Sequence, residues 1–519
     1  MTNAGRLWMS AEAAFDRKDW PLAEARYGQA LEVDPTHVPS LIGRSTVLTN
    51  LGRHREAHAS IMLAWDRQPE DPALRYGLAQ RLRYFSEFAA LEECLAHPSV
   101  ASTAPVPILA RCVVMLSSIG AHAAAVRLAD AALARNGVDP ACLYVRGNLH
   151  FFDGQLDQAE ACYEKSMRSD PMMVQASWML ASVRTQTEQS NHVDRLRQQL
   201  GRAVAGGQGE VYLNYGLHKE LHDLGDFEGA WQALEAGNRA KRRQVEFSLA
   251  EARSYLDAMR SAFTADFITA GSETGLAARP IFIVGMHRSG TTLLERILSG
   301  HSMIGDAGET SSIDAQIQLA ADYAAPGRTD PLLVERMRAM DFGRMGQGYA
   351  RHVPWLARGN KSFTEKLPSN FWNVGAILKA LPEARILHLV RDPMDTCFSN
   401  LRTFFAGVAT YSYDQDELAA FYGVYREMMQ HWHAVAPGAV LDVDYHELVQ
   451  APETVAKRVA LHCGVPYEDG MIDTTRSHGR VATASASTAR QGIRRDRGSV
   501  WKHYERHLGA LQDGLARFY

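Results

Sequence analysis

The sequence predicts an α + α/β protein, in which an all-α solenoid of helical repeats precedes a three-layer α/β, P-loop-like domain with a parallel sheet. Three observations indicate this fold class. A pattern of small and large residues recurs every 34 residues in the first half of the chain. An apolar strand, a glycine-bounded loop and an amphipathic helix open the second half. A second apolar strand, which ends in arginine, follows further along the chain.

The repeat begins with Ala23, Tyr27, Ala30 and Pro35. Its later copies are Ala57, Ile61, Ala64 and Pro69; Ala125, Ala129, Ala132 and Gly137; and Ala159, Tyr163, Ser166 and Pro171. Small residues let two antiparallel helices approach closely, and the larger residue fills the space beside them. The proline after Asp34 or Asp170 stops the second helix of its pair. The pattern therefore predicts stacked helix pairs over residues 4–243.

This pattern resembles a tetratricopeptide repeat (TPR) array. The resemblance implies a curved solenoid whose concave surface holds a peptide or a partner protein. Residues 244–278 are expected to form a helical linker, and residues 279–519 the second domain.

Composition excludes several classes of protein. The 519 residues carry 55 Lys and Arg against 59 Asp and Glu, and this balance argues against bulk nucleic-acid binding. No apolar run reaches about 18 residues, so no membrane span is expected. The first residues lack the pattern of a secretory signal. The six cysteines have no CxxC spacing, which disfavours a zinc site or a disulfide scaffold. A cytoplasmic protein is expected.

The start of the second half has the pattern of a phosphate-binding loop. Residues 281–284 are four consecutive apolar residues, which predict a buried parallel strand. The segment GMHRSGTT follows at residues 285–292 and leads into a helix, an arrangement that points backbone N–H groups at an anion. Its spacing matches GxxxxGK[ST], except that Thr291 occupies the lysine position. This loss argues against ATP or GTP hydrolysis, and Arg288 supplies positive charge instead.

A second phosphate site is predicted downstream. Residues 385–390 form an apolar strand that ends at Arg391, and Ser399 follows eight residues later. An arginine and a hydroxyl at the start of a helix can bind a second phosphate group. A third strand is expected at residues 439–443.

The two segments together resemble the sulfotransferases that use 3′-phosphoadenosine 5′-phosphosulfate (PAPS), over about residues 279–506. The resemblance implies that Arg391 and Ser399 bind the 3′-phosphate, and that adenosine 3′,5′-bisphosphate is the product. No metal is expected. The residues implied for the 5′-phosphosulfate are His287, Arg288, Ser289, Gly290, Thr291 and Thr292.

The base is implied by a resemblance to protein-tyrosine sulfotransferases, whose GEET-like segment aligns with residues 307–310. Glu309 falls at the position of the catalytic glutamate and Thr310 is retained, whereas Gly308 replaces the first glutamate. A glutamate acting near neutrality favours partial burial, which raises its pKa. Lys366 matches the family's lysine in a K-x-P segment, where an ammonium can follow charge on the leaving group.

Other residues could act as the base. Asp306 is the nearest rival of Glu309. Cytosolic small-molecule sulfotransferases use a histidine, for which the candidates are His287, His301 and His388. His388 lies within a strand and His301 at a helix end, so none of them displaces Glu309.

The family's closing cofactor loop is expected near the C-terminus. Ser485 matches a serine close to the leaving group. The usual basic residue before the tryptophan is replaced by Val500, and Arg497 is our choice of substitute. The other basic residues nearby are Arg490, Arg494, Arg495 and Lys502.

These observations predict a PAPS-dependent sulfotransferase that modifies an acceptor hydroxyl, with a tyrosine of a protein or peptide favoured and the TPR array helping to recognise it. A glycan, a lipid or a small phenol stays open as acceptor. The alternatives are a P-loop nucleotide kinase or hydrolase, and a TPR scaffold with an inactive nucleotide-binding domain. No nucleic-acid partner is expected, and a homodimer is left open.

Overall fold

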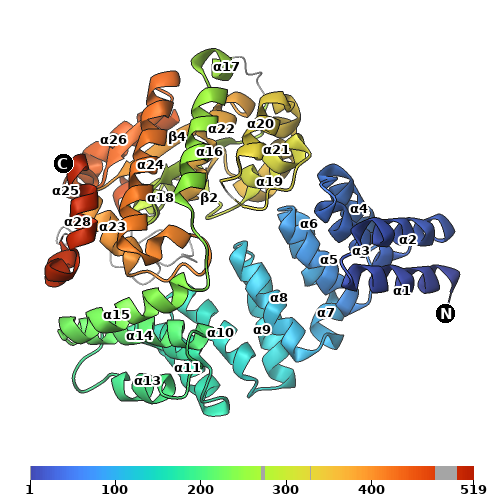
Figure 1. Ribbon diagram of the computed structural model, residues 1–519, viewed down its shortest axis with the longest axis horizontal. Helices are drawn as coiled ribbons and strands as arrows, with labels where there is room; N and C mark the ends of the chain where they lie inside the picture. Colours follow the sequence, from blue (N-terminus) through green and yellow to red (C-terminus); the bar gives the residue numbers. More distant parts are fainter. Residues whose placement is uncertain (1, 270–274, 328, 474–498) are drawn as a thin grey trace.

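The computed structural model describes residues 2–269, 275–327, 329–473 and 499–519 (Figure 1). Its first part is built from helices that pack as consecutive antiparallel pairs, as the repeat predicts. These helices are α1 (Asn3–Asp16), α2 (Trp20–Val33), α3 (Val38–Asn50), α4 (His54–Asp66), α5 (Pro72–Tyr84), α6 (Phe88–Ala96), α7 (Pro98–Thr103), α8 (Val106–Ser118), α9 (His122–Arg135), α10 (Pro140–Asp153), α11 (Leu156–Ser169), α12 (Val174–Val183), α13 (Val193–Leu200), α14 (Gln208–Asp223) and α15 (Phe227–Arg242).

The repeated residues form the contacts between these helices. Ala23, Tyr27 and Ala30 are fully buried in the structure. The ring of Tyr27 lies so close to α3 that a Cβ atom added at Gly43 would meet it at 2.5 Å. The 34-residue period therefore arises because small residues are needed wherever two helices pack closely together.

The second part is built on a five-stranded parallel sheet with the order β2-β3-β1-β4-β5. Its strands are β1 (Arg279–Gly285), β2 (Ile304–Asp306), β3 (Ser362–Glu365), β4 (Arg385–Val390) and β5 (Val440–Asp444). Three of them confirm the strands expected from apolar runs. The sequence gives no comparable signal for β2 and β3, which are short and partly polar. The phosphate loop follows β1, the central strand.

Helices cover both faces of the sheet, which gives the three layers predicted. Ile281 and Ile283 of β1 pack with the helices on one face, whereas Phe282 and Val284 pack with those on the other. The first face carries α18 (Thr291–Ser299), α25 (Tyr445–Gln450) and α26 (Pro452–Cys463). The second carries α16 (Leu249–Ala262), α21 (Phe342–Ala357), α22 (Val374–Ala380) and α24 (Gln415–Val435).

The remaining elements surround this core. They are α17 (Ala265–Thr269), α19 (Ser312–Ala321), α20 (Pro331–Ala339), α23 (Pro393–Leu401), α28 (Gly509–Leu515) and the 3₁₀ segments η1 (Pro368–Asn373), η2 (Thr410–Tyr413), η3 (Asp469–Ile472), η4 (Val500–His507) and η5 (Ala516–Phe518). Within the described ranges, no helix is long and apolar enough to cross a membrane.

The solenoid curves so that both of its ends contact the second part (Figure 1). Near its start, α4 packs against α19 and α6 against α21; near its end, α15 packs against η2 and η4. Buried residues of α14 and α15 belong to the same apolar cluster as the core around α24. The two parts therefore share one apolar core at the C-terminal end of the solenoid.

The start of the solenoid holds both ends of α19. At the helix C-terminus, the Arg55 guanidinium donates to the carbonyl oxygen of Leu319 at 3.0 Å and also to that of Ala320. At the other end, Ser86 Oγ lies 3.0 Å from Ser311 Oγ. Ser86 is buried in the turn between α5 and α6, so its hydroxyl has a fixed position. Helix α19 is thus held in place by the solenoid.

Candidate functional site

The predicted site residues lie at the carboxyl ends of four adjacent strands. In the sheet order β2-β3-β1-β4, these strands are followed by Glu309, Lys366, the phosphate loop and Arg391. The Glu309 loop is tied to the end of β3, because Lys366 N donates to Gly308 O at 2.9 Å. Crevices at the carboxyl ends of parallel strands are where α/β folds bind ligands. The topology therefore brings together residues that are far apart in the sequence.

The phosphate loop has an unusual backbone. Arg288 has a φ angle of +66°, which is strained for a residue with a side chain. Gly290 has a φ of +109°, and a Cβ atom there would lie 2.5 Å from the ring of Tyr445. Gly290 also begins α18 without any side-chain hydrogen bond to the first backbone N–H groups of the helix. Leu293 N donates to Gly290 O, whereas the N–H groups at the very start of a helix have no intrahelical acceptors and are suited to an anion.

The other loop residues line the same turn. Ser289 is 1% exposed, and its Oγ has no hydrogen-bond partner among the described residues. Thr291 and Thr292 are buried in the first turn of α18. His287 is held from outside the loop, since its Nδ1 lies 3.0 Å from the Tyr411 hydroxyl and its carbonyl accepts from Asn400 at 2.6 Å. All six predicted loop residues therefore lie together between β1 and α18.

Arg391 lies beside the phosphate loop. Its guanidinium carbon is 4.7 Å from the centre of the Tyr445 ring, and its Nη1 donates to Arg288 O at 3.4 Å. Its Nη2 lies 3.5 Å from the Asp395 carboxylate.

The expectation that Ser399 lies at a helix start was wrong. Asp392 caps α23 and Pro393 begins it, so Ser399 falls in the last turn of this helix. Proline favours the first helical position, which fixes where the helix begins. Ser399 nevertheless faces the phosphate loop, because Arg288 Nε donates to its Oγ at 3.2 Å. The two predicted phosphate sites are therefore in direct contact.

Lys366 lies between Glu309 and α18, the helix that follows the phosphate loop. Its ammonium group is fully buried, forms an ion pair with the Glu309 carboxylate, and lies 3.8 Å from Glu295 of α18. Glu309 itself is exposed, with 41% of its side chain accessible, so the expected partial burial of this residue was wrong. Lys366 thus has carboxylates on two sides, one open to solvent and one in the protein interior.

These contacts set the charge states of the buried groups. Burial alone would lower the pKa of Lys366, but the carboxylates of Glu309 and Glu295 outweigh it and hold this pKa above its usual value. Burial raises the pKa of Glu295 to about 8, although the nearby Lys366 ammonium opposes the rise. The charged form of Lys366 is therefore favoured, whereas burial disfavours the charged form of Glu295.

The family of this part of the chain follows from comparison with known proteins. Residues 280–469, which contain the phosphate loop, Glu309, Lys366 and Arg391, match the model of the sulfotransferase family. This part of the chain is similar to the sulfotransferase family. The helices before it are similar to those of TPR proteins.

Individual relatives are distant. An uncharacterized protein of Aquifex aeolicus is 28% identical over 378 residues, which cover 70% of this chain and 49% of that protein. The chain thus spans about half the length of this relative. A TPR protein of Cytophaga hutchinsonii is 12% identical with a TM-score of 0.34, over 44% of this chain and 93% of its own. The sulfotransferase domain of a Synechococcus olefin synthase is 16% identical with a TM-score of 0.27, over 48% and 98%.

The rival bases of the sulfotransferase domain have other contacts. His301 fixes a turn, since its Nε2 lies 2.9 Å from Pro466 O and its Nδ1 accepts from Met303 N. His388 lies on the sheet face that carries α24, and α18 covers the opposite face. Asp306 ends β2, and burial raises its pKa.

Part of the predicted cofactor loop lies outside the described residues. This applies to Ser485 and Arg497, and to Arg490, Arg494 and Arg495. The described chain resumes at Ser499, whose N–H donates to Asp395 Oδ1 at 2.9 Å. Lys502 and Trp501 line a cavity of about 580 Å³ beside this contact. The C-terminal segment therefore packs against α23, the helix that carries Ser399.

Two residues of the site were missed by sequence reasoning. Glu295 is buried on the amphipathic helix α18, where a lone carboxylate among apolar neighbours was the available signal. Tyr445 packs against both Gly290 and Arg391, but it follows β5 and no spacing in the sequence connects it with them.

Glu295 predicts a pH dependence of stability. Its folded pKa of about 8 exceeds the ordinary value of 4.5, so between these pH values the folded chain keeps a proton that the unfolded chain has lost. The free energy of unfolding should therefore fall as pH rises through this window. The Glu295→Gln variant lacks this contribution. Between pH 5 and 8, its thermal midpoint should therefore fall by several degrees less than the midpoint of the wild type, as measured by scanning calorimetry.

Glu453→Gln, an exposed carboxylate paired with Lys457 on α26, is the matched control and should follow the wild type. Parallel curves for the wild type and Glu295→Gln would contradict the raised pKa.

Proposed function

We propose that this protein transfers the sulfuryl group of PAPS to an acceptor hydroxyl, and that the preferred acceptor is the hydroxyl of a tyrosine in a protein or peptide. The observation that carries the proposal is the contact between Arg288 and Ser399. This contact brings the two predicted anion sites next to each other. A nucleotide with phosphate groups at its 3′ and 5′ positions would occupy both sites at once. The Lys366–Glu309 pair lies in the adjacent loops of the same sheet edge.

The described residues fit such a cofactor. The first turn of α18 offers uncapped N–H groups, and Ser289 offers a buried hydroxyl without a partner in the described chain. Arg288 brings a forked cation to the loop. Thr291 replaces the lysine that reaches the γ-phosphate in nucleoside triphosphatases, which favours a shorter 5′ group than a triphosphate.

The chemistry follows from the charges of the chain. When bound, PAPS supplies the sulfuryl group: its sulfur–oxygen bond to the 5′-phosphate breaks, sulfur bonds to the acceptor oxygen, and adenosine 3′,5′-bisphosphate leaves. Glu309 accepts the proton that the acceptor hydroxyl loses. Lys366 and Arg288 balance the negative charge that remains on the departing phosphate. Arginine and lysine provide this charge, so the proposal needs no metal ion in the site.

A pocket lined by α19, the helix that follows the Glu309 loop, supports a phenolic acceptor. This pocket of about 290 Å³ lies between α16, α19, α20 and η1, and Ser311 on its wall follows Glu309 by two residues. Tyr255 and Trp372 form an aromatic wall, with ring centres 5.1 Å apart. Asp314 and Asn373, joined by a hydrogen bond of 2.8 Å, form a polar one. An aromatic ring with one polar end matches both walls.

We propose a second role for the solenoid besides binding an acceptor protein. Arg55 and Ser86 hold the two ends of α19, the helix that begins just after Glu309 and lines the acceptor pocket. The array would therefore position the base as well as the acceptor. We place the protein in the cytoplasm, because all six cysteines are free and five are buried, as expected in a reducing compartment.

Cofactor binding is tested by calorimetry with adenosine 3′,5′-bisphosphate and with ATP plus magnesium. The full-length chain should bind the bisphosphate and bind ATP far more weakly. Ser399→Ala should weaken bisphosphate binding by about tenfold or more, because a hydrogen bond to a charged group is lost. Ser169→Ala, which removes an exposed hydroxyl on α11, is the control. Tight binding of ATP and none of the bisphosphate would refute the proposal.

Catalysis is tested by transfer of labelled sulfate from PAPS to tyrosine-containing peptides and small phenols. Glu309→Gln should lower the rate by about 100-fold or more, because general-base catalysis typically contributes this factor. Its affinity for the bisphosphate should stay unchanged. Glu335→Gln, an exposed carboxylate on α20, should keep full activity. Full transfer activity of Glu309→Gln would exclude Glu309 as the base.

The positioning role of the solenoid is tested by Arg55→Ala. We expect kcat with a small phenolic peptide to fall by about tenfold while bisphosphate binding is kept, because a small displacement of α19 moves Glu309. Arg53→Ala is the matched control, since Arg53 pairs with Glu24 and Glu56 inside the solenoid. If both variants lose the same activity, or if Arg55→Ala loses bisphosphate binding equally, the array acts only as a structural support.

A further inference from the structure

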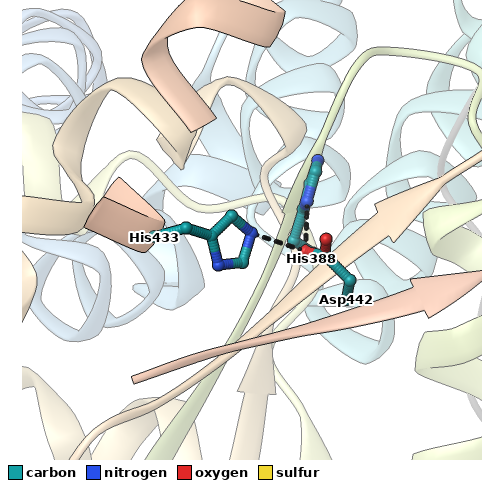
Figure 2. A group of neighbouring side chains, drawn as sticks. All are labelled: His388, His433 and Asp442. Carbon is teal, nitrogen blue, oxygen red and sulfur yellow. Dashed lines mark hydrogen bonds and ion pairs between the residues drawn. The ribbon is translucent and has the colours of Figure 1, made fainter. Parts of the chain in front are cut away.

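Three side chains from separate elements meet at the edge of the sheet, away from the phosphate loop. His388 of β4 and Asp442 of β5 are register partners in the parallel pair, and His433 lies near the end of α24 (Figure 2). His388 Nδ1 lies 2.8 Å from Asp442 Oδ1, and His433 Nε2 lies 2.9 Å from the same oxygen. The ligand atoms of all three lie within 4.8 Å of one another.

The chemistry of this group suits a zinc-type ion. Imidazole nitrogens and a carboxylate oxygen are ligands that zinc takes at about 2.0–2.2 Å, and two histidines with one carboxylate form a common set. Asp442 Oδ1 lies within hydrogen-bond distance of a nitrogen of each imidazole, so the three ligand atoms already lie together.

The surroundings fix the orientation of His388 and leave His433 and Asp442 partly exposed to solvent. The far nitrogen of His388, Nε2, forms a hydrogen bond with the Tyr425 hydroxyl on α24, which fixes the ring. Such outer partners are typical of metal-bound histidines. The side chains of His433 and Asp442 are 37% and 51% exposed, so an ion can enter from solvent and keep a water molecule. Arg426 is a cation near His388, and the Asp442 carboxylate opposes its charge.

We propose that His388, His433 and Asp442 form a binding site for one divalent ion of the zinc type, with water as a further ligand. The ion would replace the hydrogen bonds that now join the two imidazoles to Asp442 Oδ1, and each metal-bound ring would carry its proton on the other nitrogen. It would bind β5, the edge strand, to β4 and to α24. The site lies on the sheet face opposite α18, so the ion has a structural effect and no part in sulfuryl transfer.

The test is calorimetric titration of the metal-free full-length chain with zinc chloride, repeated with cobalt chloride to record the visible absorption of the bound ion. The wild type should bind one equivalent and unfold at a higher temperature with zinc, because the ion stabilises the state that binds it. His433→Ala and Asp442→Asn should weaken zinc binding by at least about tenfold. Even the loss of a residue that only hydrogen-bonds to a metal ligand typically lowers metal affinity by about that factor, and these variants lose a ligand itself.

His433 and Asp442 are partly exposed, so these variants should fold even if His388→Ala does not. His446→Ala, which removes an exposed histidine of α25, is the matched control and should bind like the wild type. Equal zinc binding by the wild type and the two ligand variants would overturn the proposal. So would a loss in His446→Ala as large as the loss in His433→Ala.

Discussion

The buried ammonium group of Lys366 is the constraint on which the rest of the site depends. A fully buried cation is tolerated only when opposite charge lies close to it. Here Glu309 supplies that charge from the loop after β2, while Lys366 itself follows β3 and the Glu295 carboxyl group of α18, whose charge burial disfavours, lies 3.8 Å away. These segments must therefore keep fixed relative positions. The same requirement places a cation beside the phosphate helix, where the proposed reaction leaves negative charge.

Both the sheet order and the solenoid help to keep these segments in fixed relative positions. The order β2-β3-β1-β4 lines up Glu309, Lys366, the phosphate loop and Arg391 in one row. Helix α19, which follows Glu309, packs against α20 and α21 and is joined to η1 by the Asp314–Asn373 hydrogen bond. The solenoid adds further anchors at the two ends of α19 through Arg55 and Ser86. The repeat array is therefore part of the catalytic architecture under the proposed function, in addition to being a surface for partners.

The parts of this arrangement that have a periodic or apolar sequence pattern could be predicted from the sequence. The 34-residue period gave the solenoid, and the apolar runs gave β1, β4 and β5. Strands β2 and β3 were not predictable, because residues 304–306 and 362–365 are short and partly polar. The helix containing Ser399 was misjudged because Pro393, six residues earlier, begins it. The contacts of Arg55 and Tyr445 depend on tertiary packing, which leaves no local pattern in the sequence.

The edge strand β5 links the proposed metal site to the phosphate loop. Asp442 lies within β5, and the strand ends at Asp444, directly before Tyr445. Tyr445 packs against Gly290 and under the Arg391 guanidinium, so a displaced β5 would move the wall of both anion sites. An edge strand has a neighbour on one side only and is the strand of a sheet most easily displaced. A contact that ties Asp442 to His388 and His433 therefore protects the geometry of the phosphate loop from the opposite face of the sheet, with or without an ion in place.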